Sequence, residues 1–324
     1  MKTCWIVTRD RKSQLEWRDL PVPQPQAGEI LMRVRATALN RGEIVVGGVM
    51  HGGAEKLGGL EAAGEVQAVG AGVTQFSPGE RIFGRVRGSF AEYATIFEHQ
   101  AMLVPERLSW EQAAAIPISY ITAWEMLCSP CGPLKAGEWL LITGASAGAG
   151  VASIQLAKLV GARSIGTSGS QEKLAKLKSI GLDVAIATRG ADFAAQVKEA
   201  TGGKGADLIA NLVGGSQFAE CLRCLARNGR LVVVGYVDGV YKAELDLAAV
   251  HANRFQIFGV SNAKLTVDER IQSARGFARD VMPAIADGRI EPLIDRVFPF
   301  DELPAAKAWM ESSAMTGKIV VRVA

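Results

Sequence analysis

The stretch from Leu140 to Gly161, LLITGASAGAGVASIQLAKLVG, has residue types that can cradle a phosphate group. An apolar run breaks into a loop of glycine, alanine and serine and then resumes at helical spacing, which predicts a strand, a turn and a helix. Gly144 permits a tight turn, and Gly148 and Gly150 let the backbone approach a pyrophosphate and pack against the sheet. The free N–H groups of the helix would then face the phosphates. A plain strand-to-helix turn is the alternative, because such turns are common and two alanines dilute the glycines.

The segment about twenty residues after this loop bears on which dinucleotide would bind. Folds that select NAD usually place an acidic residue there to bond both ribose hydroxyls. This chain reads GTSGSQEK, with no acid at the strand end. The small residues Ser168, Gly169 and Ser170 leave room for a 2′-phosphate, and Lys173 and Arg189 supply cations that can pair with it. We therefore expect NADPH rather than NADH, with solvated surface charge as the alternative interpretation of both cations.

The elements around these residues indicate a parallel, doubly wound α/β sheet. Apolar, β-rich runs recur along this part of the chain, with helix-like stretches between most of them. The runs are 164–167, 184–187, 208–212, 231–234 and 256–260, and the helix-like stretches are 171–180, 193–200 and 216–226. A dinucleotide-binding domain of the Rossmann type is the prediction for residues 121–286.

The rest of the chain has a different sequence pattern, with short runs that alternate apolar and polar residues, many glycines and three prolines near the start. It predicts a separate, mostly β domain. Residues 1–120 supply most of this domain. A short helix and a final strand, GKIVVRV, within 287–324 are expected to rejoin it.

Composition narrows the classes of function. The chain has 324 residues, of which 48% are hydrophobic and 21% charged, as expected for a two-domain globular enzyme. Its net charge of +3 comes without a long single-sign block, so we expect neither nucleic acid nor a membrane as a principal partner. No apolar run reaches the roughly 18 residues that span a bilayer. The first twenty residues become charged too early for a signal peptide, which predicts a cytoplasmic location.

Four of the five cysteines form two CxxC pairs, Cys128 with Cys131 and Cys221 with Cys224. The pairs are roughly ninety residues apart, far outside zinc-ribbon spacing. Cys221 and Cys224 stand at i and i+3 in a helix-like run beside leucines, so we expect two small buried apolar groups. A redox role for either pair stays open.

Ordered motifs spread over nearly the whole length carry a family resemblance. They are ALNRGE at 38–43, LGGLEAAGEV at 57–66, VGAGVTQFSPGERIFG at 69–84, GSFAEYA at 88–94, LKAGEWLLITGASAGAG at 134–150, and TGKIVVRV at the end. The chain resembles a medium-chain dehydrogenase/reductase of the zinc-independent quinone oxidoreductase type. The resemblance implies a Rossmann domain, 121–286, a GroES-like catalytic domain, 1–120 and 287–324, and a homodimer that pairs sheet edges.

The resemblance also predicts no metal site. Zinc-dependent relatives have a Cys where this chain has Asn40 and a His where it has Leu60, and neither residue supplies the ligand that zinc prefers. The lobe of four cysteines that holds a structural zinc is missing after Gly84. Without a Lewis acid, the expected reaction is hydride transfer from NADPH to an acceptor that is already electrophilic, a quinone or an α,β-unsaturated carbonyl.

Asn40 is the first candidate catalytic residue, as a hydrogen-bond donor to the oxygen on which negative charge develops. A turn residue that bonds its own backbone is the alternative. Arg41 follows it, in a segment that the resemblance places near the nicotinamide. Tyr120 is the third candidate catalytic residue, and plain interdomain packing is the alternative interpretation of its side chain. Relatives often carry a tyrosine shortly after the Asn segment, where this chain has Met50 and His51, so water is the alternative source of the proton.

The expected cofactor contacts lie in the loops at the carboxyl ends of the strands, where such a fold binds its ligand. They are Thr122, Gly144, Ser146, Ala147, Gly148, Ala149, Gly150, Val151, Ser168, Gly169, Ser170, Lys173, Arg189, Asn211, Val213, Gly235, Tyr236, Val260 and Asn262. Two alternative functions remain, an enoyl-thioester reductase and a catalytically weak NADPH-binding sensor protein.

Overall fold

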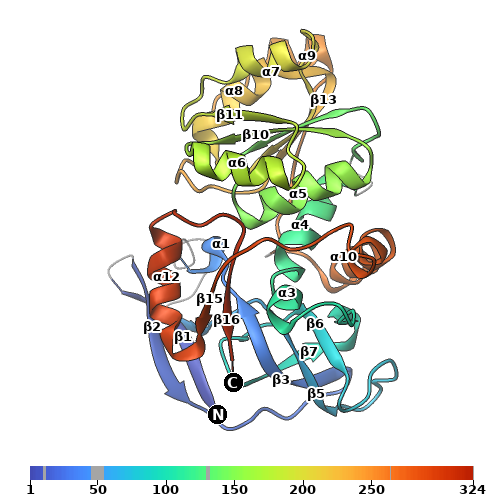
Figure 1. Ribbon diagram of the computed structural model, residues 1–324, viewed down its shortest axis with the longest axis vertical. Helices are drawn as coiled ribbons and strands as arrows, with labels where there is room; N and C mark the ends of the chain where they lie inside the picture. Colours follow the sequence, from blue (N-terminus) through green and yellow to red (C-terminus); the bar gives the residue numbers. More distant parts are fainter. Residues whose placement is uncertain (10–11, 45–54, 129–131, 263, 324) are drawn as a thin grey trace. The chain divides into compact units, whose positions relative to one another are not determined.

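The computed structural model describes residues 1–9, 12–44, 55–128, 132–262 and 264–323 (Figure 1). The chain divides into two compact units. Unit 1 comprises Met1–Ile121 and Thr266–Ala324, and unit 2 comprises Thr122–Leu265. The Rossmann domain predicted from the sequence runs to residue 286, beyond the end of unit 2. In the structure, α10 (Val267–Asp280) and α11 (Met282–Ala286) belong to unit 1, where Arg107 Nη1 donates a hydrogen bond to Ile285 O at 3.0 Å.

Unit 2 is built on one six-stranded sheet in the order β11-β10-β9-β12-β13-β14, and every neighbouring pair is parallel. The strands are β9 Trp139–Thr143, β10 Arg163–Ser168, β11 Val184–Ala187, β12 Ala206–Asn211, β13 Leu225–Val233 and β14 Gln256–Gly259. The helices are α5 Gly148–Leu159, α6 Gln171–Ser179, α7 Ala194–Ala200, α8 Phe218–Arg223 and α9 Leu247–Asn253. The predicted doubly wound α/β fold is confirmed, and its strand order reverses beside β9.

One predicted helix in unit 2 was too long. The sequence favoured a helix over 216–226, but α8 ends at Arg223 and the next residues belong to β13. Leu225 pairs in parallel with Ala206, whose N–H donates to Cys224 O at 2.9 Å. Because this strand pairing satisfies the backbone, it outweighs the local helical preference.

Unit 1 contains a seven-stranded sheet in the order β15-β16-β3-β5-β6-β8, with β7 paired to β3, and a three-stranded sheet in the order β2-β1-β4. Its strands are β1 Lys2–Arg9, β2 Lys12–Asp19, β3 Glu29–Ala38, β4 Glu55–Leu57, β5 Glu61–Val69, β6 Arg81–Arg85, β7 Tyr93–Phe97, β8 Ala101–Leu103, β15 Ile294–Pro299 and β16 Lys318–Arg322. This is the predicted GroES-like domain. The expected return of the final strand is confirmed, because β16 pairs antiparallel with β3.

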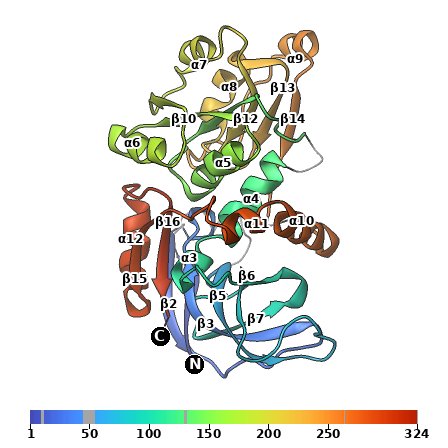
Figure 2. The same cartoon turned by 45° about the vertical axis from the view of Figure 1, so that its right-hand side comes forward.

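Helices of different lengths complete unit 1. They are α1 Arg41–Ile44, α3 Trp110–Ala114, α10, α11 and α12 Leu303–Glu311, which packs beside β15 and β16 (Figure 2). Helix α4, Pro117–Leu127, begins in unit 1 and continues into unit 2. Among the described residues, no helix combines the length and the apolar character that crossing a bilayer requires.

Candidate active site

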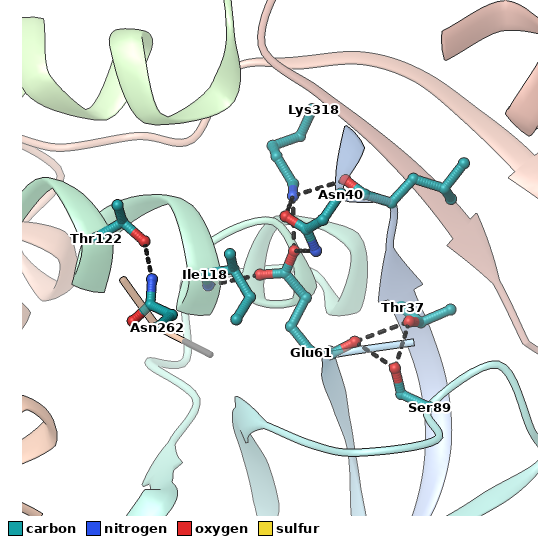
Figure 3. A network of polar contacts seen from close by, with 9 residues as sticks. Thr37, Asn40, Glu61, Ser89, Ile118, Thr122, Asn262 and Lys318 are labelled. Atoms are coloured by element: carbon teal, nitrogen blue, oxygen red, sulfur yellow. Dashed lines mark hydrogen bonds and ion pairs between the residues drawn. The ribbon is translucent and has the colours of Figure 1, made fainter. Parts of the chain in front are cut away.

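A buried polar network lies in unit 1 just past the end of β3 (Figure 3). Asn40 Nδ2 donates to Glu61 Oε1 at 2.8 Å, and Lys318 Nζ donates to Asn40 Oδ1 at 3.0 Å. The same ammonium donates to Glu61 Oε1 at 2.6 Å. The Asn40 side chain thus bonds two charged partners from distant parts of the sequence and not its own backbone, so the turn-residue alternative does not describe it.

Strand register brings these three residues together. Val320 of β16 pairs with Ala38 of β3, which places Lys318, at the start of β16, opposite Asn40. On the other side of β3, Thr37 pairs with Ala62, and Glu61 begins β5. The antiparallel sheet therefore presents the carboxylate and the ammonium on either side of the residue that follows β3.

The ion pair is nearly removed from solvent, with side-chain exposures of 0% for Glu61 and 5% for Lys318. Buried charges persist only where hydrogen bonds satisfy them. Lys318 Nζ donates a further bond to Leu39 O at 2.9 Å, and Glu61 Oε2 accepts from Ile118 N at 2.7 Å. Sequence reasoning missed both charged residues. A single lysine in the apolar strand KIVVR, and a glutamate opening EAAGEV, were the available signals.

The backbone of Glu61 is held as firmly as its side chain. Its carbonyl oxygen accepts from Thr37 Oγ1 at 2.7 Å and from Ser89 Oγ at 2.9 Å, and the two hydroxyl oxygens are 2.8 Å apart (Figure 3). All three residues are buried. The carboxylate beside Asn40 is therefore fixed at both ends.

The network determines which way the Asn40 amide faces. Its oxygen meets an ammonium and its nitrogen meets a carboxylate, and each such charge-assisted bond contributes about 1.5–3 kcal/mol. In the flipped orientation, the amide nitrogen would face the Lys318 ammonium, donor against donor, and the amide oxygen would face the Glu61 carboxylate, acceptor against acceptor. Among the described residues, only one of the two Nδ2–H groups has a protein partner, so the other is available to a ligand.

A second buried carboxylate, Glu43 on α1, lies in the same part of unit 1 and is 1% exposed. Its Oε1 accepts from Gly59 N at 2.9 Å and lies 3.7 Å from Lys56 Nζ, whereas Oε2 has no hydrogen-bond partner among the described residues. Burial raises the pKa of Glu43 to about 7, although the Lys56 ammonium opposes the rise. Glu43 is therefore largely protonated below neutral pH.

The other two predicted catalytic residues make different contacts. Arg41 Nη2 donates to Met310 O at 2.5 Å and to Ser313 Oγ at 3.2 Å, and burial lowers its pKa. Tyr120 is 1% exposed, burial raises its pKa, and its hydroxyl lies 3.4 Å from Glu291 O. The contacts of Arg41 favour a role in anchoring α12, which contains Met310. The burial of Tyr120 favours a role in packing. Met50 and His51, where relatives carry a tyrosine, lie outside the described residues.

In unit 2, the glycine loop has the close backbone packing that the sequence predicted. Gly144 adopts a φ of +64°, and its N–H donates to Thr167 Oγ1 at 3.1 Å. A Cβ on Gly150 would lie 2.4 Å from Ala145 O, so only glycine fits between α5 and the turn. Helix α5 begins at Gly148 after Ala147, whose side chain forms no cap. Ser146, Ala149 and Val151 complete this turn and the start of α5.

The loop after β12 is organised by Asn211, which is fully buried. Asn211 Oδ1 accepts from Thr143 Oγ1 at 3.0 Å and from the N–H groups of Val213 and Gly214 at 3.1 and 3.0 Å, while Nδ2 donates to Gly214 O at 2.9 Å. Thr143 Oγ1 also accepts from Leu212 N at 3.1 Å. Asn211 therefore shapes the loop that carries Val213, and Thr143 is a further residue that sequence reasoning missed.

The residues predicted to select the cofactor gather at the end of β10. Ser168 is buried, and Ser170 caps α6 by accepting from Lys173 N at 3.4 Å. A Cβ on Gly169 would lie 2.2 Å from Arg189 Cγ and Nε, so the Arg189 side chain lies directly over this glycine. Arg189 is exposed and forms no ion pair with a described residue. The structure thus places an available guanidinium beside the small residues.

The remaining predicted contacts also belong to unit 2, with Thr122 in the middle of α4 and the others in the segments that follow β13 and β14. Asn262 Nδ2 donates to Thr122 Oγ1 at 2.5 Å (Figure 3), and Val260 N donates to Val233 O at 3.1 Å. Gly235 packs so closely on Leu212 that a Cβ would lie 2.7 Å from its carbonyl oxygen. Tyr236 contacts Tyr241 with ring centroids 5.2 Å apart.

The described residues hold no group of three or more His, Cys, Asp or Glu side chains placed to bind a metal ion. Cys221 and Cys224 are both fully buried in the core of unit 2, as expected, and burial raises the pKa of Cys224 to about 12. Such thiols are poor nucleophiles and poor metal ligands at neutral pH. Cys128 is half-buried, and Cys131 lies outside the described residues.

Comparison with known proteins identifies the family. Residues 26–106 match the alcohol dehydrogenase GroES-like domain, and residues 148–277 match the zinc-binding dehydrogenase domain. Quinone oxidoreductase of Rattus norvegicus is 30% identical over 94% of this chain and 92% of that protein. The chain belongs to the quinone oxidoreductase-like family of medium-chain dehydrogenases/reductases.

The chain is also similar to proteins with other names. A phenolphthiocerol/phthiocerol polyketide synthase protein of Mycobacterium tuberculosis is 31% identical over 93% of this chain, which spans only 14% of that protein's length. An NAD-dependent alcohol dehydrogenase superposes with a TM-score of 0.87 at 29% identity. A mycobacterial protein solved with NADPH gives 0.88 at 26% identity, and each superposition covers both chains completely. Membership of this family supports an oxidoreductase activity and a nicotinamide cofactor.

Proposed function

We propose that this protein is an NADPH-dependent reductase that transfers hydride, without zinc, to a quinone or an α,β-unsaturated carbonyl compound. The observation that carries the proposal is the Asn40 amide, held between Glu61 and Lys318 with one N–H available. Bound NADPH supplies the hydride. Water supplies the proton that completes the two-electron reduction.

Asn40 would act on the oxygen of the acceptor. Addition of hydride to a quinone or an enone places negative charge on that oxygen, and a fixed N–H donor stabilises the charge without reorganising during the reaction. The amide is half-buried, and its two protein partners already fix its orientation. Asn40 therefore supplies the electrostatic part of catalysis.

The chemistry of the Asn40 network does not suit zinc. Zinc prefers thiolate, imidazole or carboxylate ligands, and the Asn40 amide is instead bonded to Glu61 and to an ammonium ion. Lys318 brings its own positive charge to within 2.6 Å of the nearest carboxylate oxygen, where a second cation would be repelled. These observations support a reaction that proceeds without a metal.

The NADPH preference rests on the end of β10. No acidic residue stands at the end of the strand, where Ser168, Gly169 and Ser170 lie, and Arg189 lies over Gly169 with its charge available. A guanidinium binds phosphate through two parallel N–H groups, which suits the 2′-phosphate that distinguishes NADPH. The uncapped start of α5 would receive the pyrophosphate.

Reduction of an enoyl thioester is the second candidate. The match of nearly the whole chain to part of a polyketide synthase favours it. The same donor would serve, because hydride addition to an enoyl thioester also places charge on a carbonyl oxygen. The two candidates differ only in the acceptor.

A homodimer is a further part of the proposal. Strand β14 is the last strand of the unit 2 sheet, and an unpaired edge is a ready template for pairing with a second copy. Ile257 on this strand is 37% exposed, and Leu247 on the preceding helix is 72% exposed. Pairing of two β14 strands would cover these apolar side chains.

The test follows the absorbance of NADPH, and separately of NADH, with a small quinone, an alkenal and an enoyl thioester. Each assay uses chelator-treated and zinc-supplied protein, with Asn40→Ala alongside the native chain. The proposal expects rapid loss of NADPH that zinc does not change, and at least tenfold lower kcat for Asn40→Ala with unchanged cofactor affinity. Native kcat in Asn40→Ala would contradict it. Tight binding of NADPH without turnover of any acceptor would favour the sensor.

A further inference from the structure

The ion pair beside Asn40 has no hydrogen-bonding capacity left on its ammonium. Lys318 Nζ has three N–H groups, and Leu39 O, Asn40 Oδ1 and Glu61 Oε1 accept them at 2.9, 3.0 and 2.6 Å. An ammonium has no further donor. Lys318 is therefore unable to donate directly to an acceptor molecule while this network is intact.

Glu61 accepts three hydrogen bonds and, as a carboxylate, donates none. Its Oε1 accepts from Asn40 and Lys318, and its Oε2 accepts from Ile118 N at 2.7 Å. Within the described part of the chain, the network leaves one unused donor, the second Nδ2–H of Asn40. The two charged residues can affect the reaction only through that amide or through the fold.

We propose that Lys318 and Glu61 are positioning residues that fix the orientation of the Asn40 amide. This inference rests on the proposed function, in which Asn40 is the donor to the acceptor's oxygen. An isolated amide has two nearly isosteric orientations, and only one presents an N–H to a given point. The ammonium selects the oxygen and the carboxylate selects the nitrogen, so the remaining N–H always faces away from the pair.

The proposal predicts that loss of the ion pair lowers kcat through Asn40 alone. Lys318→Met removes the charge and keeps much of the side-chain volume, whereas Lys318→Arg keeps a cation with several donors. We expect kcat to fall at least tenfold in Lys318→Met and to recover partly in Lys318→Arg. NADPH affinity, measured by fluorescence titration, should stay within twofold of the native value, because the proposed phosphate contacts lie in unit 2 and Lys318 lies in unit 1.

A double-mutant cycle separates positioning from a purely structural role. In an Asn40→Ala background there is no amide to orient, so Lys318→Met should change kcat less than twofold. Lys176→Met provides the matched control, since Lys176 is on the surface of unit 2 and pairs with Glu172. This control should leave kcat unchanged in both backgrounds.

A second variant keeps the test decisive if Lys318→Met leaves Glu61 unpaired and unfolds unit 1. Glu61→Gln is nearly isosteric and can still accept from Ile118 N, but its amide matches either orientation of Asn40. We expect the same loss of kcat in Glu61→Gln. In an Asn40→Ala background, Glu61→Gln should again change kcat less than twofold. Circular dichroism and thermal unfolding identify which variants are folded.

The inference would be overturned if Lys318→Met lowered kcat by the same factor in the native and Asn40→Ala backgrounds. That result would show that the ion pair acts through the structure of unit 1 and not through the Asn40 amide. Native kcat in both Lys318→Met and Glu61→Gln would overturn it as well. Either result leaves the proposed function intact. If Asn40→Ala itself retains native kcat, the proposed function fails and the inference fails with it.

Discussion

The buried carboxyl of Glu43 gives a prediction about stability that can be worked through from the structure. Its pKa rises from an ordinary value of 4.5 to about 7 in the folded protein, chiefly because burial disfavours the charged form. The folded state therefore holds this proton in a pH range where the unfolded chain releases it. The free energy of unfolding must fall as pH rises from 4.5 through 7.

At 1.36 kcal/mol per pKa unit, the rise corresponds to about 3 kcal/mol of stability lost over the whole range, and most of this loss falls between pH 5 and pH 8. Glu43→Gln keeps an oxygen that can accept from Gly59 N and has no proton to release. Relative to the native chain, the variant should therefore gain about 2–3 kcal/mol from pH 5 to pH 8.

Urea unfolding at pH 5, 6, 7 and 8, followed by tryptophan fluorescence, measures this difference. Glu65→Gln is the control, because the Glu65 side chain is 39% exposed and belongs to the same unit. The control measures the effect of replacing a carboxyl that is not buried. If Glu43→Gln ran parallel to the native profile, the argument that burial keeps Glu43 protonated would be refuted.

Three further predictions concern unit 2. In Gly150→Ala the new methyl would lie 2.4 Å from Ala145 O, so we expect urea unfolding to show a loss of about 1–3 kcal/mol and fluorescence titration to show weaker NADPH binding; native values for both would contradict the close packing. In Gly169→Ala the methyl displaces Arg189, so the Kd for NADPH should rise about tenfold and that for NADH less than twofold. Unchanged NADPH affinity would remove Arg189 from the phosphate site. Ile257→Lys should convert a dimer to monomer in sedimentation at micromolar concentration, and an intact dimer would place the interface elsewhere.

Much of the fold was predictable because it depends on local patterns. Buried parallel strands need continuous apolar runs, and the run at 184–187 coincides with β11 residue for residue. Helix α6 starts where Ser170 can cap it. The helix predicted over 216–226 was too long, because Leu225 and the residues after it pair with β12. The local sequence does not reveal this interaction.

The candidate site was less predictable, and the reason is geometric. The position of Asn40 after a strand suggested a polar side chain with a function, but its partners follow from the register of β3 with β5 and β16. Nothing near Asn40 in the sequence indicates that Lys318 would lie opposite it. Burial likewise decides the protonation state of Glu43, and its 1% exposure follows from packing that its sequence neighbours do not reveal.

The interrupted course of unit 1 has a consequence for how the protein comes into being on the ribosome. Lys318 lies 257 residues after Glu61, and the uninterrupted stretch that forms unit 2 is synthesised between them. At about 5–20 residues per second, the carboxylate waits roughly 10 to 50 s for its ammonium partner. Unit 2 can complete its sheet during that interval, whereas unit 1 stays unfinished until β16 emerges and inserts beside β3. The nascent chain thus acquires its nucleotide fold before the ion pair at Asn40 can exist.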